Sequence, residues 1–310
     1  MVLEKIVSAE EAMAKPSIPI IDLENFPEKY DRLLREACEE WGCFRLVNHN
    51  IPISLMSEMK AVGMSLFDLP TEIKERNTPV VPGGGYAAND VYETLGFHDI
   101  RSQQDVEQFC SELDVSDHQR KVIDSYNKSM GDLLTKLSEK LGSSLGLNGY
   151  SFESWKILFR INKYNIQPEH IGTMGFPGHT DVGFLTILQD DEIVGGLEVM
   201  EKKSGEFVGV DSMPGSFFVI FGDLGNVWSN GRFCNARHRV KFIEASPRIS
   251  MGSFVMGPRE GAVEAPTELV DDEHPRLYIP CTWEHYLKLR FTPSIGKDSL
   301  ADVLVHPANE

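Results

Sequence analysis

Apolar and polar residues alternate through much of the second half of the chain, as they do in β-strands that bury one face. The alternation is clearest in 156–166. One face of this predicted strand consists of Leu158, Arg160, Asn162 and Tyr164. Further strands are predicted at 184–189, 196–200, 216–223, 237–243 and 249–258, with a hairpin turn at 202–207. Many short strands separated by turns are typical of a sandwich or barrel, and we expect a jelly roll.

Helical spacing of apolar residues is more common in the first half of the chain. Helices are predicted at 30–41, 53–67 and 116–145, with a short one at 282–291. The segment 116–145 is amphipathic, with most charged residues opposite its apolar stripe, so we expect it to pack across the barrel as a support. The run 18–23 contains Pro19 and is therefore predicted to be an edge strand, and a further strand is expected at 42–49.

These elements predict an α+β fold with a mainly β core. The core is expected to be a double-stranded β-helix barrel of the jelly-roll or cupin type, supported by α-helices. We divide the chain into an N-terminal helix and strand region at 1–115, a supporting helix at 116–155, the barrel core at 156–295 and a C-terminal tail at 296–310.

The stretch 78–97 has no clear period and is predicted to be a loop, because prolines and three consecutive glycines interrupt it. The glycines lack the Lys-Ser/Thr ending of a phosphate-binding loop, which excludes that function. Loops on rigid scaffolds often determine specificity. Tyr86 and Tyr92 are therefore either walls of a substrate site or anchors of the loop itself.

Three residues of the β-rich half form a candidate metal site. His179 and Asp181 are two positions apart, so on an extended strand both side chains point to the same face. His238 lies on a later strand, which a barrel can place alongside the first. Two imidazoles and one carboxylate make a facial triad that leaves coordination positions open and suits non-haem Fe(II) oxygenases. A zinc hydrolase could use the same three ligands.

Arg248 and Ser250 also share one face of a predicted strand, shortly after His238. A guanidinium fork and a hydroxyl can clamp a carboxylate through charge-assisted hydrogen bonds. A metal with open positions beside such a clamp fits a 2-oxo acid cosubstrate, whose keto-acid end chelates the metal while its far carboxylate pairs with Arg248. A zinc hydrolase would not need the clamp, which favours the oxygenase.

The composition narrows the range of partners. Lys and Arg number 30 against 47 Asp and Glu, a net charge of −17, which argues against nucleic acid or an anionic membrane as a partner. No apolar run approaches the ~20 residues of a membrane helix. The N-terminal residues do not resemble a secretory signal, and five irregularly spaced cysteines predict reduced thiols. We expect a cytoplasmic protein, monomeric or weakly oligomeric, whose partners are a small-molecule substrate and O2.

Six segments together have a recognisable pattern. They are WGCFRLVNHNIP at 41–52, FRINKYN at 159–165, HTDVGFLTILQDDEIVGGLEVM at 179–200, GDLGNVWSNGRFCNARHRV at 222–240, PRIS at 247–250 and APTELVDDEHPRLY at 265–278. The chain thereby resembles the plant 2-oxoglutarate- and Fe(II)-dependent dioxygenases over nearly its whole length. Within them it is most similar to the dioxygenases for auxin oxidation. The segments 83–96 and 172–181 differ from that subgroup, and both are expected to approach the substrate.

The resemblance implies an enzyme that uses Fe(II) and 2-oxoglutarate, with ascorbate as the reductant added in vitro. The residues that it implies for the metal are His179, Asp181 and His238, and those for 2-oxoglutarate are Arg248, Ser250, Tyr164 and Asn162. The implied reaction oxidises a small aromatic plant metabolite while 2-oxoglutarate is decarboxylated to succinate. The predicted substrate is indole-3-acetic acid or its amino-acid conjugates, converted to the 2-oxindole form.

Five residues are candidates for contact with this substrate. Phe254 lies on the same predicted strand face as the carboxylate clamp, where it could stack on an aromatic ring or fill the barrel core. Arg160 is either a cation for the substrate carboxylate or an ordinary rim residue. Phe159, Tyr86 and Tyr92 complete the aromatic set. Two alternatives remain: hydroxylation or O-demethylation of a neutral specialised metabolite, and a barrel that binds a small molecule without turnover.

Overall fold

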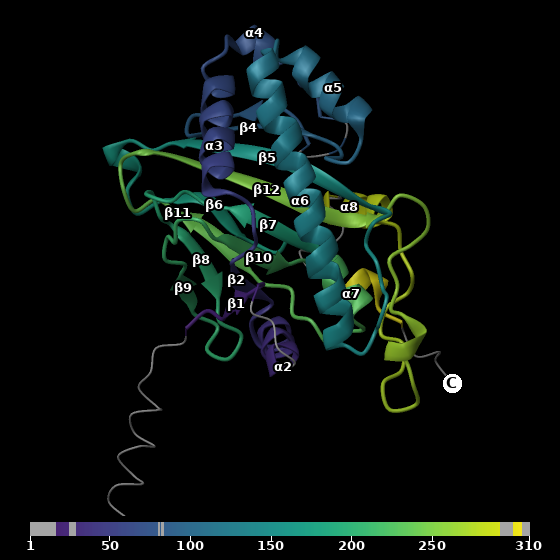
Figure 1. The fold of residues 1–310 in the computed structure, drawn as a ribbon. Helices are drawn as coiled ribbons and strands as arrows, with labels where there is room; N and C mark the ends of the chain where they lie inside the picture. Colours follow the sequence, from purple (N-terminus) through teal and green to yellow (C-terminus); the bar gives the residue numbers. More distant parts are fainter. Residues whose placement is uncertain (1–16, 25–28, 80, 82–83, 292–299, 306–310) are drawn as a thin grey trace, which may run out of the picture.

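The computed structural model describes residues 17–24, 29–79, 81, 84–291 and 300–305. Within these residues the chain forms a larger and a smaller β-sheet (Figure 1). The larger sheet contains, in order of neighbours, β1 (Ile20–Asp22), β2 (Cys43–Val47), β10 (Phe217–Phe221), β7 (Leu185–Gln189), β12 (Pro247–Pro258), β5 (Trp155–Asn165), β4 (Tyr92–Phe97) and β3 (Ala87–Ala88). The smaller contains β6 (Met174–His179), β11 (His238–Lys241), β8 (Leu197–Met200) and β9 (Phe207–Gly209).

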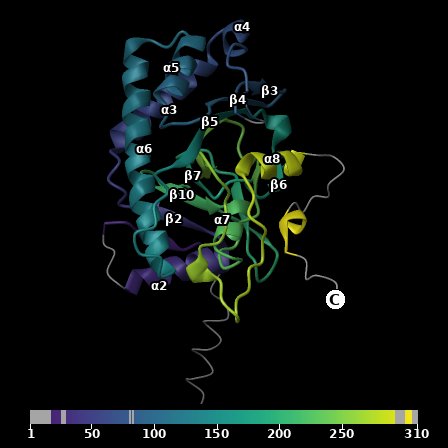
Figure 2. The same cartoon turned by 90° about the vertical axis from the view of Figure 1, so that its right-hand side faces the viewer.

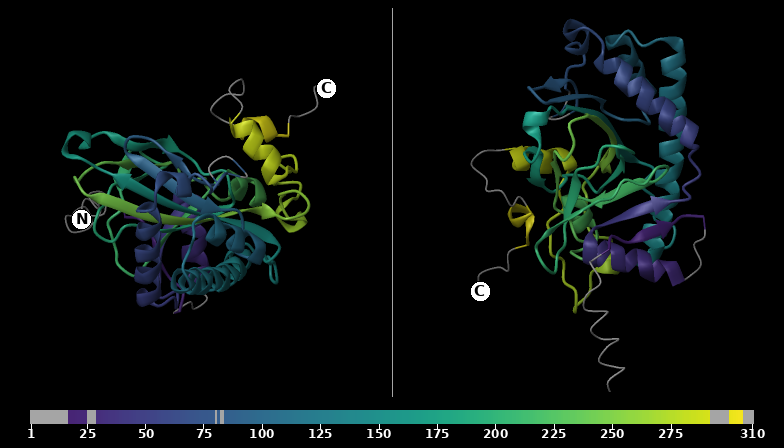
Figure 3. Two further views of the ribbon diagram at one scale, coloured as in Figure 1. Left: turned by 90° about the horizontal axis from the view of Figure 1, so that it is seen from above. Right: turned by 90° about the vertical axis from the view of Figure 1, so that its left-hand side faces the viewer.

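Helices flank the sheets on more than one side. The α-helices are α2 (Lys29–Glu36), α3 (Ile53–Phe67), α4 (Thr71–Lys74), α5 (Gln103–Glu112), α6 (Asp117–Ser144), α7 (Asp223–Trp228) and α8 (Trp283–Phe291). A π-helical turn at Ala37–Trp41 continues α2, and 3-10 turns occur at Pro168–His170, Thr267–Leu269 and Ala301–Val303. Figure 2 shows α6 along one side of the strands and α8 on another, while Figure 3 shows α3 beside α6.

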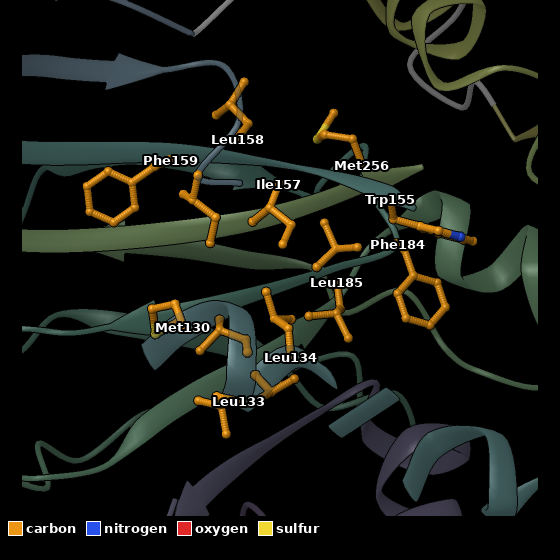
Figure 4. Close-up of a cluster of buried hydrophobic side chains, with 14 of the residues drawn as sticks. Met130, Leu133, Leu134, Trp155, Ile157, Leu158, Phe159, Phe184, Leu185 and Met256 are labelled. Carbon is orange, nitrogen blue, oxygen red and sulfur yellow. The ribbon is translucent and has the colours of Figure 1, made fainter. Parts of the chain in front are cut away.

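The long helix α6 is the predicted support. Its first turn is closed by a capping box, in which the Ser116 side chain accepts from the Gln119 backbone and Gln119 reaches back to the Ser116 backbone. Its apolar stripe packs against the larger sheet, and Figure 4 shows Met130 and Leu134 facing Ile157 of β5. Because this stripe covers one face of β5, the side chains on the other face of the strand point away from α6. That other face lines the site described below.

The strands β5 and β12 form the longest antiparallel pair of the structure and set the register of the site. Arg248 lies opposite Tyr164, and Ser250 lies opposite Asn162. Because side chains alternate between faces along a strand, these four residues point to the same side of the sheet. The pairing therefore places the predicted clamp beside the polar residues of β5.

The predicted loop at 78–97 was wrong for its second half, since Tyr92–Phe97 forms strand β4 and pairs with β5. Gly96 lies within this strand, where a Cβ atom would come within 2.6 Å of the Phe159 carbonyl oxygen. The glycine thus permits close backbone approach rather than a turn. Pro82 and Gly83 of the predicted loop lie outside the described residues.

Strands from the N-terminal region and from the barrel core belong to one sheet, since β1, β2, β3 and β4 pair within the larger sheet. The sheet thus joins regions that the proposed division of the chain separates. The boundaries at 115, 155 and 295 stay predictions. Most of the predicted tail at 296–310 lies outside the described residues. Among the helices that are described, none combines the length and apolarity needed to cross a bilayer.

Candidate metal centre

His179, Asp181 and His238 come together where strand β6 ends and strand β11 begins. The two histidines lie opposite each other in the β6–β11 pair, and their ring centroids are 4.2 Å apart. The Asp181 Oδ1 atom is 3.5 Å from His179 Nε2 and 3.8 Å from His238 Nε2. One donor atom from each side chain lies within 4.8 Å of the others, so the three side chains could hold one metal ion.

Backbone carbonyls orient both imidazole rings. His179 Nδ1 lies 2.9 Å from the Pro177 carbonyl oxygen, and His238 Nδ1 lies 3.1 Å from that of Ala236. A carbonyl can only accept, so in the neutral rings Nδ1 has the proton and Nε2 keeps its lone pair for a metal. Burial lowers the pKa of His238 despite the nearby Asp181 carboxylate, which favours the neutral, ligating form.

The Asp181 carboxylate is oriented and kept ionised by its neighbours. The Thr186 hydroxyl donates to Asp181 Oδ2 at 2.5 Å, on the oxygen that does not face the histidines. Burial alone raises the pKa of Asp181, but His238, His179 and the Thr186 hydroxyl together hold it well below its usual range. The site thus offers two imidazole nitrogens and one carboxylate oxygen, the donor set of a facial triad for Fe(II).

Arg248 faces the same site, and most of its N–H donors have no partner among the described residues. Its side chain is 1% exposed, and Nη2 donates to the Asp190 carboxylate. The Nε and Nη1 atoms are buried without a partner among the described residues. Unpaired buried donors on a charged group are costly, so they fit a carboxylate ligand that would accept from them.

The predicted partners of the clamp also face the cavity. Asn162 Nδ2 lies 3.5 Å from Ser250 Oγ, and the Arg248 guanidinium carbon is 5.5 Å from the centre of the Tyr164 ring. All four of these residues line one cavity together with the three candidate metal ligands. The structure thus brings the metal-binding set and the predicted carboxylate clamp to one site.

A second cavity adjoins the first, since both are lined by His179, Asp181, Arg160 and Phe254. The second cavity extends to helix α8, whose Leu287, Arg290 and Phe291 form part of its wall. This wall was not anticipated. The sequence predicted the helix itself, but a local pattern does not say which surface a terminal helix covers.

Three of the predicted substrate residues, Tyr92, Arg160 and Phe254, line the first cavity. Tyr92 lines the first cavity, donates to Asn162 Oδ1 at 2.9 Å and accepts from Arg160 Nη2 at 2.6 Å. Phe254 is partly buried and lines both cavities.

Two predicted substrate residues lie elsewhere. Phe159 is fully buried in the core, where its ring centroid is 5.9 Å from that of Tyr126 on α6 (Figure 4). It occupies the opposite face of β5 from Arg160, as strand alternation requires. Tyr86 lines neither cavity, and its hydroxyl lies 3.2 Å from Glu93 Oε1, so it anchors its own segment. Burial on the core face contradicts a substrate contact for Phe159, and for Tyr86 the structure favours the second of the two readings, an anchor of the loop.

Comparison with known proteins agrees with this geometry. The 2OG-Fe(II) oxygenase superfamily model matches residues 156–257, and the model described as the N-terminal region of non-haem dioxygenases in morphine synthesis matches 18–128. The 2-oxoglutarate-dependent dioxygenase DAO of Oryza sativa subsp. indica is 46% identical over 84% of this chain and 88% of its own length. Gibberellin 3-beta-dioxygenase 3 of Arabidopsis thaliana is 32% identical over 89% of this chain and 84% of its own.

Two solved structures are similar over most of this chain. The dioxygenase for auxin oxidation in rice superposes with a TM-score of 0.87 and 43% identity, covering 93% of this chain and 100% of that one. The Arabidopsis thaliana dioxygenase for auxin oxidation 1 in complex with 2-oxoglutarate superposes with a TM-score of 0.80 and 47% identity, covering 84% of this chain and 100% of that one. These similarities confirm the predicted double-stranded β-helix fold.

Proposed function

The chain belongs to the 2OG-Fe(II) oxygenase superfamily and is a 2-oxoglutarate-dependent dioxygenase, and we propose that it oxidises a small planar aromatic acid. Indole-3-acetic acid or one of its amino-acid conjugates is the substrate that we favour. Relatives described as dioxygenases for auxin oxidation support this choice, because they are similar over most of the chain.

The observation that carries the proposal for an anionic substrate is the charge of Arg160. This residue lines both cavities beside the candidate metal ligands. Among the described residues its guanidinium is hydrogen-bonded to two neutral hydroxyls, those of Tyr92 at 2.6 Å and Thr94 at 3.2 Å. A cation held in place without a carboxylate partner favours an anionic ligand, through a charge-assisted hydrogen bond.

We assign His179, Asp181 and His238 to Fe(II), on the support of their donor set and spacing. We assign Arg248 and Ser250 to the far carboxylate of 2-oxoglutarate, with support from the unpaired Nε and Nη1 of the buried arginine. In the same assignment the residues of β5 that hold the cosubstrate are Tyr164 and Asn162.

When bound, Fe(II) and 2-oxoglutarate supply the activation of O2, with release of CO2 and succinate as the substrate gains oxygen. In the proposed mechanism the chain binds and orients the reactants. Thr186 holds the Asp181 carboxylate, and Arg248 fixes the direction of the cosubstrate. Apolar side chains around the polar groups exclude water from the reacting atoms. Those that line the first cavity include Leu188, Leu197, Ile220 and Val240.

Phe254 is proposed to stack on the aromatic ring of the substrate, while Arg160 pairs with its carboxylate. This arrangement would present one edge of an indole ring to the metal, and oxygen insertion at C2 would give the 2-oxindole product. A neutral specialised metabolite, hydroxylated or O-demethylated by the same chemistry, is the alternative. It would leave the Arg160 charge without a carboxylate partner among the described residues.

A substrate screen tests the proposal. The purified protein is incubated with Fe(II), ascorbate, 2-oxoglutarate and each candidate, and succinate and the product mass are measured. A product that gains one oxygen from the auxins, with an equal amount of succinate, supports the proposal. Succinate formation that responds only to a neutral flavonoid, coumarin or alkaloid contradicts the auxin assignment. The His179→Ala protein is the control for metal-independent background.

A further inference from the structure

One buried acidic residue, Asp223, links the two segments that contain the candidate metal ligands. Asp223 is the first residue of α7 and is 1% exposed. Its backbone N–H donates to the carbonyl oxygen of Asp181 at 2.8 Å. Its Oδ1 atom accepts from Asn235 Nδ2 at 2.7 Å, in the segment that leads into His238. Asp223 thus contacts the chain beside both histidine-containing segments, through its backbone N–H on one side and its carboxylate on the other.

The C-terminal helix supplies the remaining partners of this carboxylate. Tyr286 on α8 donates its hydroxyl to Asp223 Oδ2 at 2.9 Å, and Arg290 Nη1 lies 3.3 Å from the same oxygen. The other arm of the fork, Arg290 Nη2, donates to the carbonyl oxygen of Thr180 at 3.1 Å and lies 3.3 Å from its hydroxyl. One guanidinium therefore joins Asp223 to the residue between His179 and Asp181.

The helix that provides these contacts is also a wall of the second cavity. Leu287 and Arg290 of α8 line it together with His179 and Phe254. Arg290 differs from Arg160 in its electrostatics, because its charge is already compensated by a buried carboxylate. A compensated guanidinium whose two arms are engaged is suited to holding backbone in place, whereas Arg160 is suited to meeting an anion.

We propose that Arg290 and Asp223 are positioning residues that hold the metal-ligand segment against α8. The docked helix would thereby fix the directions of His179 and Asp181, and loss of the link would loosen the metal site without removing a ligand. The inference rests on the metal assignment made above. Groups that orient metal ligands typically change metal affinity by about 10- to 100-fold when they are removed.

The test is metal affinity in the absence of substrate. Mn(II), which does not react with O2 in the assay, is titrated into the parent protein and into Arg290→Gln, and the free ion is followed by electron paramagnetic resonance. We expect the dissociation constant to rise by about tenfold or more in Arg290→Gln. The dissociation constant of Arg290→Lys should lie between those of the parent and of Arg290→Gln, because lysine keeps the charge but cannot reach both partners with a planar fork.

The matched control removes a comparable ion pair away from the cavities. Arg259 Nη2 lies 2.6 Å from Oδ2 of Asp99, whose side chain is 2% exposed, much as Asp223 is 1% exposed. Arg259→Gln should lower the melting temperature but leave the Mn(II) affinity at the parent value. If Arg290→Gln does not fold, Tyr286→Phe removes a single bond to Asp223 and should still weaken Mn(II) binding several-fold.

Two failures can be told apart. If the parent protein does not bind Mn(II), or if His179→Ala binds it as tightly as the parent does, the metal assignment itself is wrong. If the parent binds Mn(II) and both Arg290→Gln and Tyr286→Phe bind it equally well, the positioning role is overturned. In that second case a rise confined to the KM for the aromatic substrate would make Arg290 a substrate contact instead. With the native metal, the positioning role also predicts more succinate formed per oxidised product in Arg290→Gln.

Discussion

Arg248 on β12 lies opposite Tyr164 on β5, with its guanidinium carbon 5.5 Å from the centre of the phenol ring. The ring covers the guanidinium, and Asp190 occupies only one of its nitrogens. The remaining donors are held in one direction by the strand pairing. The sheet therefore determines where the Arg248 side chain starts, and the contacts with Asp190 and Tyr164 place its guanidinium.

Replacement of this fork tests the cosubstrate site. Arg248→Lys should raise the KM for 2-oxoglutarate far more than that for the aromatic substrate, because lysine keeps the charge but loses the bidentate geometry. Ser250→Ala should act in the same direction and more mildly, through loss of one hydrogen bond worth roughly 1.5–3 kcal/mol when a charge is involved. Steady-state kinetics with each substrate varied in turn measures both effects. Unchanged cosubstrate kinetics in both variants would move the clamp elsewhere.

The candidate triad makes a second prediction. His179→Ala and His238→Ala should abolish Fe(II)-dependent turnover, since each removes one of three protein ligands. Asp181→Glu should also be severely impaired, because one added methylene displaces the carboxylate, and such misplacement can cost on the order of a hundredfold. Succinate formation and bound iron are measured in parallel, with circular dichroism as the control for folding. Wild-type activity in either histidine variant would refute the triad.

Replacement of the two phenylalanines of the substrate hypothesis should have different effects on stability and on substrate binding. Phe159 is fully buried against α6, so Phe159→Ala should lower the free energy of unfolding by about 3–5 kcal/mol. Phe254 lines both cavities, so Phe254→Ala should mainly raise the KM for the aromatic substrate. Chemical denaturation and kinetics on both variants measure the contrast. If Phe254→Leu raises the KM for the aromatic substrate and leaves the free energy of unfolding nearly unchanged, the case for stacking is strengthened.

The contrast between these residues also explains what the sequence could predict. A period of two correctly places Arg160 and Tyr164 on one face of β5, and the same period puts Phe159 on the other. The aromatic ring of Phe159 suggests a substrate contact, whereas the period of the strand puts it on the face opposite Arg160, which packs in the core. Local periodicity was sufficient to place these side chains by face, and residue type alone was misleading.

Other features depend on contacts between distant segments. The end of the predicted loop at 78–97 is strand β4, whose Gly96 is approached closely by the backbone of β5. Arg290 lies on a helix that the sequence predicted, but its partners Asp223 and Thr180 come from other parts of the chain. No pattern within ten residues specifies where such a helix docks, so its contribution to the cavity became visible only in the structure.

The last prediction concerns the charge of Arg160. If this residue pairs with the substrate carboxylate, Arg160→Gln should lower kcat/KM for indole-3-acetic acid and leave that for the neutral indole-3-acetamide nearly unchanged. A charge-assisted hydrogen bond is worth roughly 1.5–3 kcal/mol. Since about 1.4 kcal/mol corresponds to tenfold, the loss should be about tenfold to a hundredfold. Arg160→Lys is the matched variant, and it should recover part of the preference because the positive charge remains. The overall charge of −17 gives no long-range attraction for an anion, so the preference should depend on this local group and not on the protein surface. Equal losses with the acid and the amide in Arg160→Gln would show that the residue supports Tyr92 and Thr94 instead, and the carboxylate would then need a different partner.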